Sequence, residues 1–104
     1  MKKLNESMLC PRLTKAMDLI GKRWTALIIY QLLEGSQRFN AIEAALPISG
    51  RLLSERLKEL EKEGIVKREV FSEVPVRVEY SLTEKGMALE ETIRSIQNWS
   101  KQWT

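Results

Sequence analysis

Two helical patterns with only a short connection between them lie near the middle of the chain. Over residues 39–46, apolar side chains recur three and four positions apart, and Pro47 prevents this helix from continuing. Ser49 is a favourable N-cap, and the same apolar spacing returns over residues 53–60. A connection of about three residues is the length of the turn in a helix-turn-helix. The sequence therefore predicts a helix-turn-helix whose second helix spans residues 49–63.

The hydrophobic period changes after these two helices. Residues 66–71 and 76–82 alternate β-branched or aromatic side chains with charged or polar ones. A short turn containing Pro75 joins the two runs, which is typical of a β-hairpin. A hairpin directly after a helix-turn-helix makes a winged helix. Thr83 is then a favourable N-cap for one last helix, which extends to Trp103.

The first third of the chain predicts two more helices. Pro11 suits the first position of a helix whose apolar face continues to Gly21. Residues 22–34 are apolar almost all round, so we expect this second helix at the centre of the fold. Residues 1–9 are polar and without pattern, and we interpret them as a flexible arm. The predicted fold class is α+β but mainly α, with one winged helix-turn-helix domain over residues 10–104.

Composition excludes several kinds of site. The chain has no histidine and one cysteine, which excludes Ser-His-Asp and Cys-His nucleophilic sites as well as histidine-rich or cysteine-rich metal sites. We expect no cofactor, no metal and no enzymatic activity. No run of 18 apolar residues without charge occurs, so no membrane partner is expected. The net charge of +3 is compatible with binding to a polyanion.

Several motifs, in this order, are similar to those of one known family. They are Cys10-Pro11, Gly21-Lys22-Arg23-Trp24, Arg38-Phe39, and the runs over residues 53–60 and 74–86. With these motifs the chain resembles the HxlR family of bacterial winged-helix transcriptional regulators, which is related to the MarR-type regulators. The resemblance implies a cytoplasmic homodimer that binds double-stranded operator DNA, often as a repressor. It also implies a sensing role for Cys10, since an N-terminal cysteine senses oxidants or electrophiles in several members.

The residues expected to contact DNA come from four places. On the helix over residues 49–63, the side chains away from the apolar stripe can enter the major groove. Two cations at the start of the second helix can hold a phosphate, a third precedes Phe39, and an arginine after Pro75 can reach the minor groove or its phosphates. The complete set is Lys22, Arg23, Arg38, Ser49, Arg51, Ser54, Glu55, Lys58 and Arg77.

A plainer interpretation of the same residues stays open. Residues 49–63 hold four basic and four acidic side chains, so they could form a solvated helix with ion pairs such as Arg51–Glu55. The wing could be an ordinary exposed hairpin in which Lys67 or Arg68 pairs with Glu79 across the strands. In that case the chain is a winged-helix protein-interaction module that does not bind DNA.

Cys10 stands before Pro11 at the amino end of the first predicted helix, with Arg12 and Lys15 close by. This position places positive charge near the thiol, and an accessible thiolate is the species that oxidants attack. A lone cysteine can also be a small buried hydrophobe. Because the chain has no second cysteine, the remaining products are an intersubunit disulfide, a mixed disulfide with a low-molecular-weight thiol, or an electrophile adduct. A thiol enzyme would lack both a histidine base and a resolving cysteine.

Apolar residues near both ends of the chain predict a homodimer. A long last helix with two tryptophans has few partners within so small a domain, and monomers avoid contiguous exposed apolar patches. We therefore expect N- and C-terminal dimerisation helices and a two-fold dimer, whose recognition helices would lie about 34 Å apart on a pseudo-palindromic operator. The expected contact residues are Leu13, Met17, Leu89, Ile93, Ile96, Trp99 and Trp103.

Overall fold

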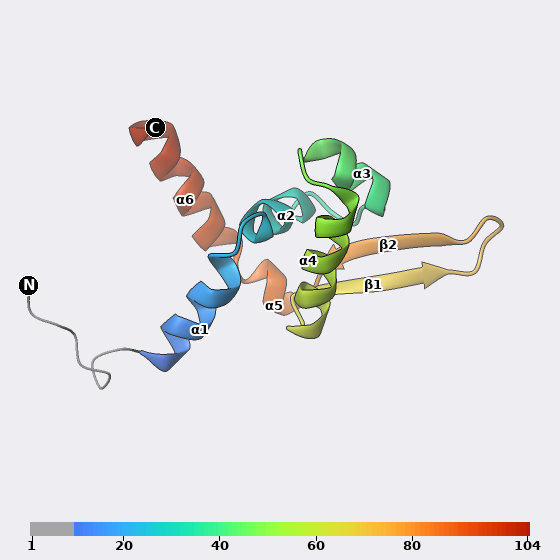
Figure 1. The fold of residues 1–104 in the computed structure, drawn as a ribbon, viewed down its shortest axis with the longest axis horizontal. Helices are drawn as coiled ribbons and strands as arrows, with labels where there is room; N and C mark the ends of the chain where they lie inside the picture. The colour runs from blue at the N-terminus through green and yellow to red at the C-terminus, as the bar shows by residue number, and fades with distance from the viewer. Residues whose placement is uncertain (1–9) are drawn as a thin grey trace, which may run out of the picture.

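The computed structural model describes residues 10–104, so the predicted flexible arm over residues 1–9 lies outside the described part of the chain. Four helices come first and are followed by a hairpin and two further helices (Figure 1). In chain order they are α1 (Pro11–Ile20), α2 (Thr25–Leu32), α3 (Phe39–Ala45), α4 (Gly50–Lys62), β1 (Val66–Phe71), β2 (Arg77–Leu82), α5 (Glu84–Met87) and α6 (Glu90–Trp103). The predicted winged helix-turn-helix is confirmed.

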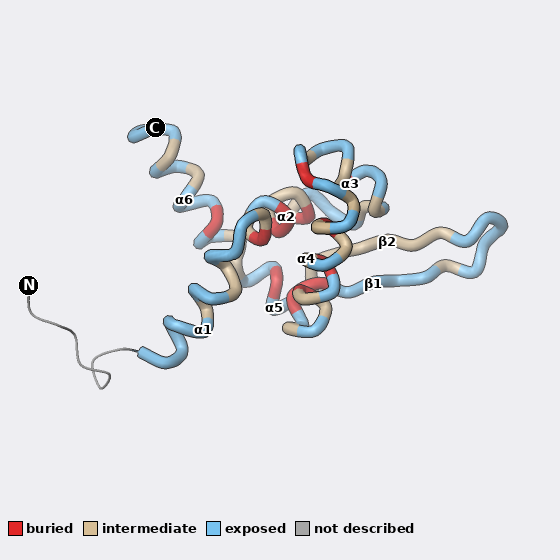
Figure 2. Tube along the Cα trace, viewed as in Figure 1, coloured by how far each residue is buried: buried red, intermediate tan, exposed pale blue. Residues whose placement is uncertain are grey.

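The core lies where α2, α3, α4 and the base of the wing meet. Figure 2 shows the buried stretches gathered on α2 and on the inner side of α4. The side chains that are almost completely buried are Ile28, Ile29, Leu32, Ile42, Leu53, Leu57, Leu60 and Ile65. The predicted central place of the second helix is therefore confirmed, because α2 has neighbours on several sides.

The second helix of the helix-turn-helix, α4, has a capping residue at its start and a glycine turn at its end. The Ser49 hydroxyl accepts a hydrogen bond from the Leu52 backbone N–H at 3.1 Å, which caps α4 as predicted. At the other end, Gly64 has a φ of +74°, a left-handed conformation that glycine adopts without strain. This turn lets the Ile65 N–H donate to the Leu60 carbonyl at 2.9 Å. α4 therefore ends sharply and leads directly into β1.

The wing has an additional bridge that sequence analysis missed. β1 and β2 pair antiparallel, from Val66 opposite Leu82 to Phe71 opposite Arg77. Gln37, just before α3, also exchanges two backbone hydrogen bonds with Tyr80, at 2.9 and 2.8 Å. A bridge of a single residue leaves no alternating pattern in the sequence. It ties the base of the wing to the helix-turn-helix, while the tip projects far from the core (Figure 1).

Two predicted helix boundaries are wrong. The second helix begins at Thr25 rather than residue 22, because Trp24 has a φ of +80°, outside the helical range. The single last helix is divided into α5 and α6 by a tight turn in which the Leu89 N–H donates to the Gly86 carbonyl at 3.0 Å. A Cβ at Gly86 would collide with the Ile65 carbonyl oxygen, so α5 packs closely under the wing before α6 leads away.

α1 and α6 extend away from the central body on the side opposite the wing (Figure 1). α1 has no buried residue, and α6 buries only Ile93. Figure 2 shows both helices as mostly exposed. Within residues 10–104, no helix has the length and apolar character needed to cross a membrane.

Candidate nucleic-acid interface

α4 divides its side chains between an inner and an outer face, as the sequence predicts. Leu53, Leu57 and Leu60 are buried, whereas Arg51, Glu55 and Lys58 are exposed and Ser54 is half-buried. Arg51 Nε lies 3.7 Å from Glu55 Oε1, but the Arg51 side chain is 92% exposed. An ion pair this exposed contributes at most about 1 kcal/mol, so the guanidinium can exchange Glu55 for another anion at little cost.

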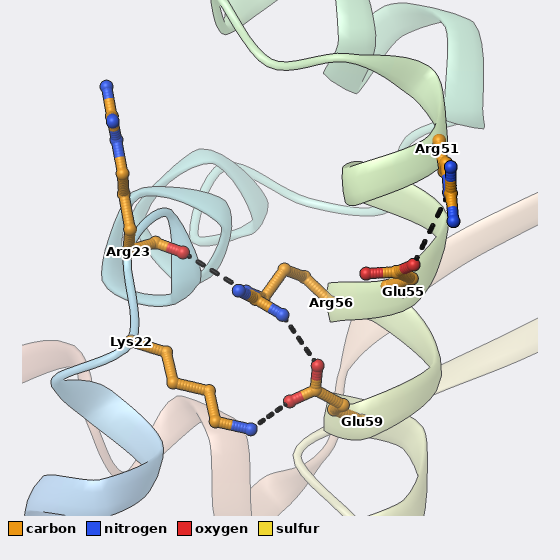
Figure 3. A network of polar contacts seen from close by, with 6 residues as sticks. All are labelled: Lys22, Arg23, Arg51, Glu55, Arg56 and Glu59. Atoms are coloured by element: carbon orange, nitrogen blue, oxygen red, sulfur yellow. Dashed lines mark hydrogen bonds and ion pairs between the residues drawn. The ribbon is translucent and has the colours of Figure 1, made fainter.

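Besides its buried and its exposed face, α4 has a side that carries Arg56 and Glu59. These two residues belong to a polar network that holds the helix in place (Figure 3). Glu59 accepts from the Lys22 ammonium at 2.5 Å and from Arg56 Nη1 at 2.7 Å. Arg56 Nε also donates to the Arg23 carbonyl oxygen at 3.2 Å. The Lys22 hydrogen bond is the main cause that lowers the pKa of Glu59, and the Arg56 hydrogen bond adds to it while burial opposes it. The network therefore joins α4 to the turn between α1 and α2.

The amino-acid sequence alone does not place Arg56 and Glu59 in this network. Their spacing of three residues indicates only a local helical pair. Arg56 also binds Arg23, 33 residues away, and Glu59 also binds Lys22, 37 residues away. No periodic pattern in the sequence predicts contacts at such separations.

The network gives Lys22 a partner within the protein, because its ammonium group binds Glu59, and the DNA contact predicted for Lys22 stays a prediction. Lys22 and Arg23 also lie in the turn before α2 and not in its first helical turn. The Arg23 side chain is exposed and its guanidinium lies 5.1 Å from the centre of the Trp24 ring. Of the two predicted phosphate ligands, Arg23 is the one without an ion pair to any of residues 10–104.

Arg38 and Ser49 each precede a helix of the helix-turn-helix. Arg38 is the N-cap residue of α3 and its side chain is exposed. The Ser49 hydroxyl caps α4, next to the exposed Arg51. Both residues therefore lie at amino ends of helices, where backbone N–H groups attract phosphates. Their DNA contacts stay predictions.

The wing gives Arg77 two acidic partners, and the DNA contact predicted for Arg77 stays a prediction. Its guanidinium donates to Glu73 at 2.7 Å and to Glu79 at 2.6 Å, and it lies 4.0 Å from the centre of the Phe71 ring. The hydrogen bond from Arg77 to Glu73 is the main cause that raises the pKa of Arg77, with burial opposing it. Arg77 thus organises the tip of the wing and does not project freely toward DNA.

The free cation of the wing lies on the other strand. Arg68 is exposed and makes no ion pair among residues 10–104, whereas Lys67 lies 3.3 Å from Glu69. The alternative in which Lys67 or Arg68 pairs with Glu79 across the strands is not found, because Glu79 binds Arg77 and Ser36 instead. Arg77 is near the turn but engaged, whereas Arg68 is exposed. Arg68 is therefore the better candidate for a DNA contact from the wing.

Residues 19–104 match the HxlR-like helix-turn-helix family. The chain belongs to this family. Its curated relatives include the HTH-type transcriptional regulator YvaP of Bacillus subtilis, which is described as uncharacterized. That protein is 61% identical over 101 residues, which are 96% of this chain and 94% of the relative. Family and relatives are transcriptional regulators, so this HxlR-like protein is a DNA-binding transcriptional regulator and not an enzyme.

Solved structures of one transcriptional regulator and one redox regulator share the fold of this HxlR-like chain. The reduced form of YodB from B. subtilis is 48% identical, covers 92% of this chain and 95% of its own, and superposes with a TM-score of 0.82. YodB also has diamide-treated and quinone-bound structures. The redox regulator HypR in its oxidized form is 40% identical, covers 91% of this chain and 98% of its own, and has a TM-score of 0.85.

Cys10 of the HxlR-like chain is exposed and forms the N-cap of α1. Its Sγ accepts a hydrogen bond from the Leu13 backbone N–H at 3.4 Å. In the single chain Cys10 is therefore not a buried hydrophobe, and its sensing role stays a prediction. Any group added to the sulfur changes an atom that already caps the helix.

The predicted dimer residues of the HxlR-like chain fall into two groups. Leu13 and Met17 on α1, and three residues on α6, are each more than half exposed; the α6 residues are Ile96, Trp99 and Trp103. Leu89 is half-buried and packs on the core. Ile93 is a correction, because it lies in the core of its own protomer with only 5% exposure. The apolar face left for a second copy is therefore narrower than predicted.

Proposed function

We propose that this chain is a homodimeric, thiol-controlled repressor that binds a pseudo-palindromic operator. The observation that carries the proposal is the arrangement of α4. Its apolar side is buried, a second side is joined to the α1–α2 turn, and its remaining face presents Arg51, Ser54, Glu55 and Lys58 to solvent. A rigid helix with one charged free face is suited to insertion into the major groove.

Contacts to the sugar–phosphate backbone would come from residues around α4. Arg23 precedes α2, Arg38 and Ser49 stand at the amino ends of α3 and α4, and Arg68 lies on the wing. Such contacts fix the position of the protein on the duplex, whereas the α4 side chains read the bases.

A salt titration of operator binding, measured by fluorescence anisotropy, tests the DNA interface. Each phosphate contact contributes about 0.9 to the slope of log affinity against log salt, so Arg68→Ala is expected to lower the slope by about one. Lys101→Ala removes an exposed cation from α6 and serves as the matched control, with an unchanged slope expected. Absence of duplex binding at low salt would leave the chain as a protein-interaction module.

Dimerisation would use the exposed apolar faces of α1 and α6. Leu13 and Met17 lie one turn apart on α1, and Trp99 and Trp103 do so on α6. Association would remove these four large side chains from water, which is favourable by about 25 cal/mol per Å² of apolar surface. Sedimentation of the intact chain should give a dimer, and Trp99→Glu with Trp103→Glu should give a monomer. A monomeric parent chain would refute this part of the proposal.

Cys10 would be the sensing thiol. Its exposure supports this role, and so do the redox neighbours, since YodB has diamide-treated and quinone-bound structures and HypR an oxidized one. The products open to it are an intersubunit disulfide, a mixed disulfide with a low-molecular-weight thiol, or an adduct with an oxidant or electrophile. Modification would change the packing of α1 and thereby the angle between the DNA-reading lobes. It acts only through a difference in free energy between DNA-fitting and non-fitting states.

The variant Cys10→Ser removes the reactive thiol but keeps a side chain that can cap α1. Serine is itself a preferred N-cap, so α1 should keep its cap. DNA binding should be unchanged without oxidant, and diamide or a quinone should no longer weaken it. Persistence of the oxidant response in Cys10→Ser would remove Cys10 from the mechanism.

A further inference from the structure

α6 meets the rest of its own protomer along one stripe of side chains. Four residues of α6 are buried or half-buried, and they recur three and four positions apart: Glu90, Ile93, Gln97 and Ser100. This spacing places them on one side of the helix. The stripe packs chiefly against α2, and beyond it α6 projects away from the central body (Figure 1). The contact between α2 and α6 therefore sets the direction of the whole helix.

One hydrogen bond gives this contact a direction. Gln97 Nε2 donates to the Tyr30 hydroxyl on α2 at 2.7 Å, and both side chains are half-buried. Among residues 10–104 it is the only hydrogen bond or ion pair that joins α6 to another helix or strand. The Arg94 guanidinium also lies 6.0 Å from the centre of the Tyr30 ring, at the outer limit of a cation–π contact. Tyr30 is therefore the polar point at which α6 is held.

Apolar packing alone does not fix the angle between the two helices. Ile93 is the buried side chain by which α6 is anchored to the core. Beside it, a hollow of about 230 Å³ remains between α2 and α6, with Leu27 and Ile96 among the residues that line it. Close packing resists rotation, whereas a hollow next to a single buried side chain permits it. Since hydrophobic attraction has no preferred direction, the hydrogen bond from Gln97 to Tyr30 holds the angle.

The angle between α2 and α6 links the two halves of the proposed dimer. At one end of this link, α2 shares the buried core with α4. At the other end, α6 carries the exposed Ile96, Trp99 and Trp103, which are proposed to meet the second copy. Recognition helices about 34 Å apart lie about 17 Å from the two-fold axis, so a rotation of about 10° moves each by about 3 Å, about one base-pair step. A small change of this angle is therefore enough to change the spacing of the two α4 helices.

We propose that Tyr30 and Gln97 are positioning residues that fix the half-site spacing which the dimer accepts. The inference rests on the proposed function of a homodimer that binds DNA. The two residues act through the angle between α2 and α6 and contact neither the bases nor the second copy. Without their hydrogen bond, each α4 keeps its own contacts to a half-site, but the separation of the two α4 helices varies.

The separation is measured first in the absence of DNA. Lys58 is exposed on the outer face of α4, so Lys58→Cys in a Cys10→Ser chain can carry a nitroxide spin label. Double electron–electron resonance then gives the distribution of distances between the two labels of a dimer. We expect a narrow distribution for the otherwise unchanged chain and a clearly wider one after Tyr30→Phe. Equal widths in a dimer would refute the inference alone. A monomer, which gives no dipolar signal, would refute the proposed function and the inference with it.

Two further variants locate the effect. Tyr80→Phe removes the same hydroxyl from a half-buried tyrosine at the base of the wing, away from α6, and should leave the distribution narrow. Gln97→Leu removes the donor and should widen the distribution as Tyr30→Phe does. The double variant should be no wider than either single variant, because both remove one shared hydrogen bond. Additive widening, or equal widening by Tyr80→Phe, would overturn the proposal.

Operator spacing supplies a measurement that a merely structural role would not move. Duplexes are selected from a library of half-sites with spacers of varied length, and anisotropy then compares the best spacer with one that is a base pair longer. We expect the parent chain to prefer the best spacer about tenfold, which corresponds to about 1.4 kcal/mol. Tyr30→Phe should reduce this preference severalfold and leave affinity for a single half-site unchanged. An equal loss of affinity for both spacers and for the single half-site would refute the positioning role.

Discussion

Replacing Glu59 by alanine tests whether the network in Figure 3 holds α4 in place. Glu59 joins Lys22 at 2.5 Å and Arg56 at 2.7 Å, and its side chain is 33% exposed. The Arg56 side chain is only 19% exposed, so it is poorly able to regain water when its partner is removed. Exposed pairs contribute about 0.2–1 kcal/mol, and hydrogen bonds to charged groups contribute more when they are partly buried. We expect Glu59→Ala to lower the free energy of unfolding by about 1–2 kcal/mol.

The assay is urea denaturation followed by tryptophan fluorescence, together with thermal unfolding. A loss of 1 kcal/mol corresponds to a fall in Tm of about 4–8 °C for a domain of this size. Glu61→Ala is the matched control, since Glu61 lies on the same helix and forms no ion pair with the described residues. It removes a carboxylate with the same change in helix propensity and should cost less than about 0.5 kcal/mol.

The pH dependence supplies an independent check of the same network. The folded state lowers the pKa of Glu59 below its ordinary value of 4.5, chiefly through the Lys22 hydrogen bond. The folded protein therefore binds this proton less readily than the unfolded chain does, and the contribution of Glu59 is complete at neutral pH. It is lost as pH falls below about 4.5 and through the folded pKa. Equal destabilisation by Glu59→Ala and Glu61→Ala at pH 7, or a difference that does not decrease as the pH falls below 4.5, would refute the reasoning.

Three further outcomes follow from other parts of the structure. Arg77→Ala should leave the salt slope of operator binding nearly unchanged, in contrast to Arg68→Ala, because Arg77 is already neutralised by two carboxylates; equal slope changes would contradict this. Gly86→Ala should destabilise the fold by about 1–3 kcal/mol in urea denaturation, since its Cβ meets the Ile65 carbonyl. Ile93→Ala should cost about 2–5 kcal/mol, whereas Ile96→Ala should chiefly weaken dimer association in sedimentation; the reverse order would contradict their burial.

Local patterns were sufficient to predict most elements of the fold. The spacing of Leu53, Leu57 and Leu60, with Ser49 as cap and Gly64 as stop, predicts α4 to within a residue at each end. The change of period after Gly64 predicts the hairpin. These predictions succeed because helix and strand periodicity, capping and turn chemistry act over a few neighbouring residues.

The availability of several charged side chains was decided by partners that the hydrophobic period does not indicate. Lys22 is a plausible phosphate ligand until Glu59, 37 residues later, is brought against it. Arg77 is engaged by Glu73 and Glu79, which are near it in the sequence, but the alternating pattern of the strand does not show this pairing. The sequence by itself therefore determined the order and type of most elements and the outer face of α4. Tertiary structure alone decided which cations stay free, because the pairing of charges depends on distance in space, which no local period encodes.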